Sequence, residues 1–203
     1  GADNESFMVF SGDAPPGSAN GKTELWNGSS WTETTDLNAA QSDGAGTGTT
    51  SNALSFGGDS PRSATEEWTG AGADVGAWST GGSMNSARNL NSRSGIYTSA
   101  LTFGGGNTVK TEKYNGTAWT ATPSLGTAIA YQSGSGTATA AISGSGGDPP
   151  TTASEKFDGS SWANAGTMNT GRRHIDGSGP QSAAFAAGGW TGTAMSNATE
   201  EYN

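Results

Sequence analysis

The sequence predicts an all-β protein, and three observations support this fold class. A sequence motif with its elements in a fixed order recurs along the 203 residues. It consists of an apolar run ending at a glycine pair, a polar loop, a Glu followed two residues later by an aromatic, a Gly turn and a Trp. The copies are roughly 45 residues apart, a period found in propeller blades. No long stretch has the apolar spacing of a helix. We therefore predict a β-propeller of about five four-stranded antiparallel blades.

The repeated markers can be aligned across the whole chain. The Glu position holds Glu24, Glu66, Glu112, Glu155 and Glu200, and the aromatic position holds Trp26, Trp68, Tyr114, Phe157 and Tyr202. The Trp position holds Trp31, Trp78, Trp119 and Trp162, and the glycine pairs are taken as 11–12, 57–58, 104–105, 146–147 and 188–189. Markers in fixed order are far more specific than any single Gly pair or Trp.

These markers predict one domain over residues 1–203, with repeats at 5–36, 37–83, 84–124, 125–167 and 168–203. The first copy lacks an innermost strand, and the last lacks the Gly turn and the Trp strand. Three interpretations follow: five blades that close imperfectly, a segment of a longer chain, or edge blades completed by neighbouring chains. We favour five blades.

The first copy illustrates how each element is predicted. Residues 7–10 and 22–26 are predicted as strands, whereas 13–21 holds two prolines and is predicted as loop without strand. Asn27 and Gly28 tolerate positive φ and predict a hairpin turn. Trp31 then opens the outermost strand.

The later copies repeat this order with local differences. In the second, 51–56 is predicted as strand and 69–77 as the longest turn; in the third, 86–94 pairs with 98–103. The low-complexity stretch 134–147 of the fourth copy indicates either close sheet packing near the axis or a loosely ordered loop. The fifth copy begins at Met168.

Charge and composition limit the function classes. Nine basic and eighteen acidic residues give a net charge of −9, which repels phosphate backbones and disfavours nucleic-acid binding. There is no cysteine, hence no disulfide, thiolate ligand or cysteine nucleophile. No stretch of about 20 apolar residues predicts a membrane-spanning helix. We expect no metal, no cofactor and no membrane insertion.

Two sets of residues invite a catalytic interpretation. The repeated Glu could form a ring of carboxylates, but a residue that recurs in every blade is expected to be structural, accepting hydrogen bonds from a neighbouring turn or pairing with Arg. Arg88 and Arg172 share one repeated slot and are expected to be structural too. His174, the only histidine, is predicted on an innermost strand, lining the channel or the core rather than acting as a base.

Binding is predicted on the face formed by the second-to-third strand loops and the blade connections. These loops vary between copies, and variable loops on a rigid scaffold usually carry recognition. The candidate binding residues are Asp13, Asp59, Arg62, Asn107, Asp148 and Trp190. The alternative is turn chemistry, because Asp and Asn favour such positions; the functional interpretation is glycan binding through hydrogen bonds and stacking on Trp190.

The order Gly-Gly, Glu-x-Tyr-Asn-Gly, Trp and Met-x-x-x-Arg, seen best at 112–119 and 84–88, resembles kelch-type β-propeller repeats over nearly the whole chain. The Gly/Thr/Ala-rich phrasing is similar to kelch-like repeat proteins of bacteriophage virions. That resemblance implies a virion surface location, as a tail-fibre or decoration module. The implied partners are other virion proteins, copies of itself, or a host-surface glycan.

An enzyme is not expected. Galactose oxidase shares the propeller fold, but its copper site needs paired His and a Cys-modified Tyr, and this chain has one His and no Cys. The sequence therefore predicts a non-enzymatic binding or docking module. The alternatives are a secreted or cytosolic kelch interaction adaptor and, ranked below it, a carbohydrate-active propeller enzyme.

Overall fold

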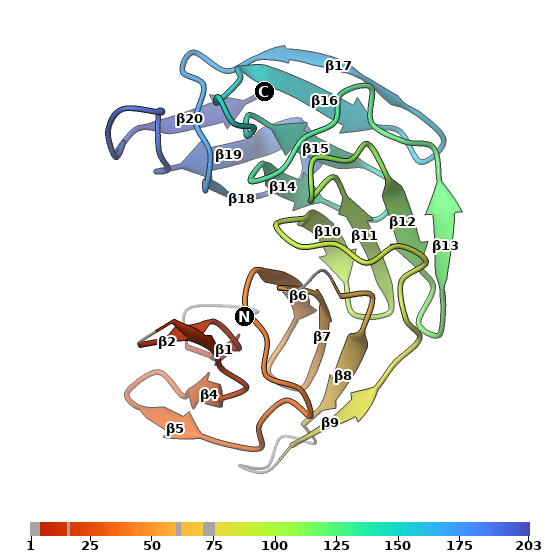
Figure 1. Cartoon of the computed structure of the whole chain (residues 1–203), viewed down its shortest axis with the longest axis vertical. Coiled ribbons are helices and arrows are strands. Elements are labelled where there is room, and N and C mark those ends of the chain that lie inside the picture. Colours follow the sequence, from red (N-terminus) through yellow and green to blue (C-terminus); the bar gives the residue numbers. More distant parts are fainter. Residues whose placement is uncertain (1–4, 16, 60–61, 71–75) are drawn as a thin grey trace.

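A computed structural model describes residues 5–15, 17–59, 62–70 and 76–203. Five small antiparallel sheets follow one another around an axis as the blades of a β-propeller (Figure 1). The three middle blades have four strands each, and the first and last have three. The structure thus confirms the predicted fold class, including the smaller first and last blades.

Within each blade the strands run outward from the axis in sequence order. The first blade consists of β1 (Phe7–Phe10), β4 (Thr23–Trp26) and β5 (Trp31–Glu33). The second consists of β6 (Gly44–Gly48), β7 (Asn52–Gly57), β8 (Thr65–Thr69) and β9 (Ala77–Thr80). The third consists of β10 (Ser92–Ile96), β11 (Ser99–Phe103), β12 (Thr111–Tyr114) and β13 (Trp119–Thr122). The fourth consists of β14 (Ser133–Gly136), β15 (Ala141–Gly144), β16 (Ala153–Phe157) and β17 (Trp162–Thr167), and the fifth of β18 (Asp176–Ser178), β19 (Ala184–Ala187) and β20 (Thr199–Tyr202).

Helix is nearly absent from the part of the chain that the structure describes. A 3-10 turn, η1 (Gln181–Ala183), connects β18 to β19. None of the described segments forms a helix of the length and apolarity that crossing a membrane requires.

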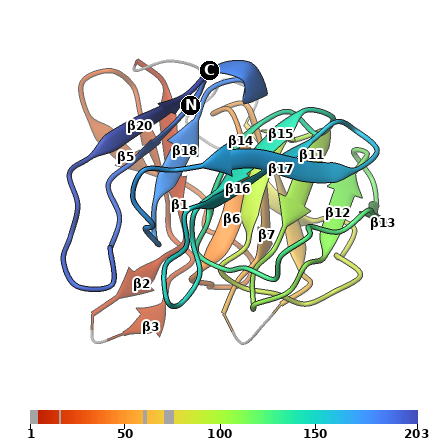
Figure 2. The same ribbon diagram turned by 90° about the horizontal axis from the view of Figure 1, so that it is seen from above.

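The loop after β1 differs from its prediction. Residues 13–21 were expected to contain no strand. In the structure β2 (Asp13–Ala14) and β3 (Ser18–Ala19) form a short hairpin with two residues in each strand. Pro15 lies just outside the paired positions, where the missing N–H of proline costs no ladder hydrogen bond. Figure 2 shows this hairpin and the loop between β19 and β20 extending beyond the sheets on the same side of the molecule.

The low-complexity stretch of the fourth copy forms an ordered hairpin, β14 with β15. A Cβ atom added to Gly134 would lie 2.3 Å from Ser92 Oγ and 2.6 Å from the Arg93 carbonyl oxygen of the neighbouring blade. Side chains larger than hydrogen do not fit at that spacing. The interpretation of close packing near the axis is therefore confirmed.

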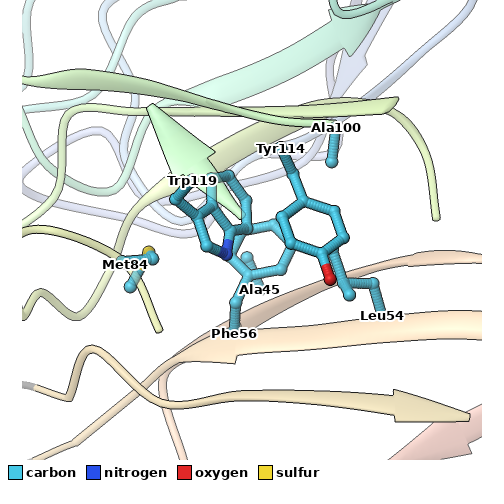
Figure 3. Packing of buried hydrophobic residues seen from close by; sticks show 7 residues of the cluster. All are labelled: Ala45, Leu54, Phe56, Met84, Ala100, Tyr114 and Trp119. Atoms are coloured by element: carbon cyan, nitrogen blue, oxygen red, sulfur yellow. The ribbon is translucent and has the colours of Figure 1, made fainter. Parts of the chain in front are cut away.

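The core consists of apolar clusters between successive blades. One of them joins the second and third blades and centres on Trp119, as Figure 3 shows. Its ring packs against Phe56 of the preceding blade at 4.9 Å between centroids, and its indole N–H donates to Thr65 Oγ1 at 2.9 Å. Trp119 therefore fastens the third blade to the second.

The same contact recurs at two other interfaces. Trp78 packs against Phe10 and donates to Thr23 Oγ1 at 2.9 Å. Trp162 packs against Phe103 and donates to Thr111 Oγ1 at 3.1 Å. A large aromatic contributes roughly 2–3 kcal/mol when fully buried, so these few residues supply much of the stability of a chain with 31% hydrophobic residues.

In four of the five copies the repeated Glu has the predicted structural role. Glu112 accepts hydrogen bonds from the Asn85 and Ser86 backbone N–H groups at 2.7 and 3.1 Å and forms an ion pair with Arg88. Glu66, Glu155 and Glu200 accept equivalent bonds from the connectors that enter their blades. Arg172 pairs with Glu200 at 2.9 Å. The carboxylates thus anchor the connections between blades.

Candidate binding site on the loop face

The loops between second and third strands and the connections between blades meet at one end of the sheets, which we call the loop face. Backbone hydrogen bonds tie each loop to the connector of the next blade: Gly12 N–H donates to the Gln41 carbonyl at 3.0 Å, and Gly58 N–H donates to the Arg88 carbonyl at 3.1 Å. Gly12 has φ 113° and Gly58 has φ 119°, a conformation that side-chain-bearing residues rarely adopt. The glycine pairs therefore build a rigid rim.

Four residues from successive connectors form a hydrogen-bonded row around the axis, which we call the collar: Asp43, Leu90, Tyr131 and His174. Leu90 N–H donates to the Asp43 carbonyl at 2.9 Å, Tyr131 N–H to the Leu90 carbonyl at 3.2 Å, and His174 N–H to the Tyr131 carbonyl at 3.1 Å. All four have left-handed backbones, with φ between 53° and 61°. Non-glycine residues in this region cost free energy and persist only where surrounding structure imposes the conformation.

The collar puts four different side chains on one repeated backbone geometry. An acid, an aliphatic residue, a phenol and an imidazole surround an open cavity of about 200 Å³. The rings of Tyr131 and His174 lie against each other at 4.4 Å between centroids. The fold fixes the backbone of the collar residue in each of these blades, whereas its side chain differs from blade to blade.

A basic residue extends this site outward. The Arg173 guanidinium lies 5.7 Å from the Tyr131 ring centroid, within cation–π range. Its Nη1 forms an ion pair with Asp148 Oδ2 at 2.5 Å. Arg173 also exchanges backbone hydrogen bonds with Trp190 at 2.8 and 2.9 Å. Tyr131, His174, Arg173 and Asp148 thus form a continuous aromatic and charged patch, and the Trp190 backbone lies beside it.

The opposite part of the collar is acidic. Partial burial raises the pKa of Asp43, and the negative charges of Asp59 and Asp13 raise it further, while His174 lowers it. Ser42 Oγ donates to Asp59 Oδ2 at 3.2 Å. Over the described ranges, no group of three or more His, Cys, Asp or Glu is placed to hold a metal ion.

The structure places four of the six predicted residues close to the collar or to its neighbour Arg173. Asp59 and Asp13 influence Asp43 by charge. Asp148 contacts Arg173. Trp190 lies beside Arg173 and pairs with Met195 across its loop.

The other predicted residues have local roles. Arg62 Nη1 donates to the Ala40 carbonyl at 2.9 Å, and its backbone pairs with that of Arg88, which fixes the loop rather than presenting a free cation. Asn107 has φ 54° and belongs to the turn after Gly106. For Asn107 the turn-chemistry interpretation accounts for the residue.

The alignment of one loop needs correction. In the fourth blade the pair with left-handed backbone begins at Ser145, with φ 56°, followed by Gly146 with φ 96°. The predicted pair, 146–147, was one residue late. Asp148 consequently does not match Asp13 and Asp59, and Trp190, directly after Gly189, does.

His174 is also displaced from its prediction. It precedes β18 instead of lying on an innermost strand, and it belongs to the collar. Sequence reasoning missed Asp43, Tyr131 and Arg173 as site residues. The signal that could have found the collar is its constant place in the repeat, because one residue at the end of each connector forms it. The residue type at this place differs in every copy.

Arg93 of β10 points into the space around the axis. It lines the cavity beneath the collar and a second one of about 360 Å³ bounded by the glycines of the inner hairpins. Surrounding protein lowers the pKa of Arg93, and the Asp176 carboxylate opposes that shift. Arginine nevertheless stays charged. The Arg93 guanidinium therefore places a positive charge in the space around the axis, next to the collar.

No protein-family model matches the chain, and no curated protein matches it.

Proposed function

We propose that the chain is a kelch-like, non-enzymatic propeller of a bacteriophage virion that uses its loop face to bind a host-surface glycan. The resemblance of its repeats to kelch-like virion proteins supports the family and the location. Exposure at a virion surface would give the loop face access to host polysaccharide. Other virion proteins and copies of itself are the alternative partners.

One observation carries the proposal: a repetitive scaffold presents non-repetitive chemistry at the collar. Asp43, Leu90, Tyr131 and His174 share one backbone conformation and differ completely in side chain. Structural positions in this chain keep their residue type, as the repeated Glu and Trp do. Variation confined to one rim is typical of recognition loops on a rigid framework.

The chemistry of the patch suits a sugar. Tyr131 and Trp190 offer aromatic faces for the apolar face of a pyranose ring, and their polar tips can form hydrogen bonds. Asp59, Asp148 and Arg173 add acceptors and donors for hydroxyl groups. The non-enzymatic part of the proposal is supported by four of the repeated Glu residues, whose carboxylates accept hydrogen bonds from connector N–H groups.

The test is a glycan array probed with the purified chain and three variants. We expect binding to a bacterial surface glycan that falls at least about tenfold in Trp190→Ala and in Asp59→Ala. Trp31→Ala is the matched control, because Trp31 is an aromatic with 47% exposure on the first blade rather than on the loop face. It should bind like the parent chain.

Three outcomes would decide against the proposal. Binding that survives both loop-face substitutions would place the site elsewhere. Absence of glycan binding, together with cross-links from the loop face to other virion proteins, would replace recognition by docking. Turnover of a glycan by the purified chain would show that it is an enzyme.

A further inference from the structure

One arginine stands at a place where three other blades have glycine. The third residue after each collar residue is, in chain order, Gly46, Arg93, Gly134 and Gly177. Strand pairing confirms that these places are equivalent, because each lies opposite the residue two places before the glycine pair of its blade: Ser55, Thr102, Ser143 and Ala186. Three blades form without a side chain at this place, so the blade structure does not require Arg93.

Arg93 also differs from the other arginines in its contacts. Each of the other four has a protein partner: three form ion pairs, and Arg62 donates to a backbone carbonyl. Within the described ranges, no residue forms an ion pair with the Arg93 guanidinium or accepts a hydrogen bond from it. Asp176 acts on it only through its charge. Arg93 is exposed to the space around the axis, and its donors are therefore available to a ligand.

The two cavities that Arg93 lines differ in charge. The cavity beneath the collar, of about 200 Å³, is also lined by Asp43 and Asp176. The cavity of about 360 Å³, which we call the axial cavity, is bounded by the glycines of the inner hairpins, and of the described residues that line it only Arg93 is charged. Its lining comes from the second to fifth blades and uses neither the free edge of the first blade nor that of the last. An anion is therefore attracted by Arg93 and meets no carboxylate in the axial cavity.

The rest of the axial cavity offers neutral hydrogen-bonding groups. Each inner strand pairs on one side only, with the second strand of its blade, and its other edge faces the axis (Figure 1). Such an edge presents N–H and C=O groups that no neighbouring strand uses. Ser178 adds an exposed hydroxyl. The hydroxyls of Thr47 and Ser94 donate to backbone carbonyls at 2.6 and 2.9 Å and keep lone pairs for a ligand.

We infer that the axial cavity binds a sugar that carries one carboxylate, a hexuronic acid. Its carboxylate accepts two parallel N–H bonds from the guanidinium fork of Arg93. Its hydroxyl groups bind the inner strand edges and the serine and threonine hydroxyls. One water needs roughly 10–15 Å³ on the same measure, so a cavity of about 360 Å³ holds a molecule of this kind rather than a single ion.

Two other ligand classes fit less well. A phosphate dianion would meet a single cation in a chain of net charge −9. A neutral sugar would leave the Arg93 guanidinium without a charged partner. The axial cavity is separate from Asp59, Arg173 and Trp190, and binding there does not rest on glycan binding at the loop face.

The test is a backbone amide NMR titration of the purified chain with sodium glucuronate, with glucose as the matched sugar that lacks the carboxylate. We expect saturable shifts at the glycines of the axial cavity and an affinity for glucose at least about tenfold lower, as the loss of a charge-assisted hydrogen bond predicts. Arg93→Gly, the residue of three other blades, and Arg93→Gln should each weaken glucuronate binding by at least about tenfold. Lys113→Gln, which removes a cation from β12, should bind like the parent chain.

Arg93→Gln keeps the aliphatic stem of the side chain, so a loss in both variants cannot come from altered packing. Equal affinity for glucuronate and glucose, or unchanged binding in both Arg93 variants, would overturn the inference. Shifts concentrated at Arg173 and Trp190 would place glucuronate on the loop face instead. Inorganic phosphate that binds as tightly as glucuronate would show a general anion site and would also overturn it.

Discussion

At the residue scale, the ion pair of Arg88 and Glu112 shows how this protein handles buried charge. Both side chains are only 2% exposed. Arg88 Nη1 also donates to the Lys110 carbonyl at 2.8 Å, and connector N–H groups bond to Glu112. Burial lowers the pKa of Arg88, and the charge of Glu112 opposes that effect. The pair survives burial because nearly every polar atom has a partner.

Arg88→Ala should therefore lower the free energy of unfolding by about 3–5 kcal/mol, since it leaves a buried carboxylate uncompensated. Urea unfolding measures the change. Lys22→Ala is the control: it breaks the exposed pair with Glu33, whose side chains are 55% and 53% exposed, and should leave the midpoint unchanged. Equal effects of the two substitutions would contradict the structural role of Arg88.

Asp43 gives a pH-dependent prediction. Its pKa is raised above the ordinary value of 3.8 by burial and by neighbouring acids, so its protonated form is favoured in the folded chain. At pH values below 3.8 the carboxyl is protonated in both states and does not reduce the free energy of unfolding. As the pH rises through the higher folded pKa, its ionisation lowers the free energy of unfolding. Asp43→Asn keeps a residue that tolerates positive φ and removes the charge.

The Asp43→Asn variant should melt at a higher temperature than the parent at pH 7, and the difference should vanish near pH 3. Thermal unfolding at both pH values checks this. A variant that melts lower at pH 7 would show that the Asp43 carboxylate makes a favourable contact in the folded chain.

At the element scale, the fourth strands owe their stability to one tryptophan each. Trp119→Ala removes a buried indole with its hydrogen bond to Thr65, and should cost about 3–5 kcal/mol, as large aromatic truncations in cores do. Trp31→Ala, at the same place in the repeat but 47% exposed, should cost much less. Chemical denaturation of both variants compares them, and similar losses would argue against blade-to-blade fastening by Trp119.

The turn between β16 and β17 has a titratable residue where two other turns have an amide. Asp158 Oδ1 accepts from the Ser160 and Ser161 N–H groups, each at 2.8 Å, and Asn27 and Asn115 do the same in their turns. The Ser160 N–H and hydroxyl lower the pKa of Asp158 to about 2. Because its pKa is lowered in the folded chain, the Asp158 carboxylate stabilises the turn at pH values above the ordinary pKa. This stabilisation is lost as the pH falls through about 2.

The NMR titration of the Asp158 carboxyl carbon should therefore have its midpoint near 2. Ser160→Ala removes the hydroxyl donor and should move that midpoint upward. A midpoint at the ordinary value in the parent chain would mean that the turn does not hold the carboxylate.

Sequence predicted these elements because strands and turns depend on local chemistry. The Gly turns and Trp strands of the first four copies and the repeated Glu of all five were readable from the sequence. The β2–β3 hairpin was not, since two-residue strands leave no alternation pattern. The glycine pair of the fourth blade was predicted one residue too late. Its first position is Ser145, whose left-handed backbone cannot be predicted from the residue type.

At the scale of the whole molecule, the blade order followed from the repeat, whereas the site did not. The collar is assembled from connectors that lie about one repeat apart in sequence and meet only around the axis. Asp43, Tyr131 and His174 stand at the same distance after the repeated Leu37, Leu125 and Met168, but they differ in residue type, so a comparison of residue types does not group them. The variable loops pointed to the face on which the collar lies, and Trp190 and Asp148, which were predicted through them, both contact Arg173.

We propose above that the loop face binds the glycan. A backbone amide NMR titration with the glycan selected on the array tests it most directly. We expect the largest shifts at the collar residues and at Asp148, Arg173 and Trp190. Shifts concentrated instead in the turns at 27–30, 115–118 and 158–161, at the opposite end of the sheets, would contradict it.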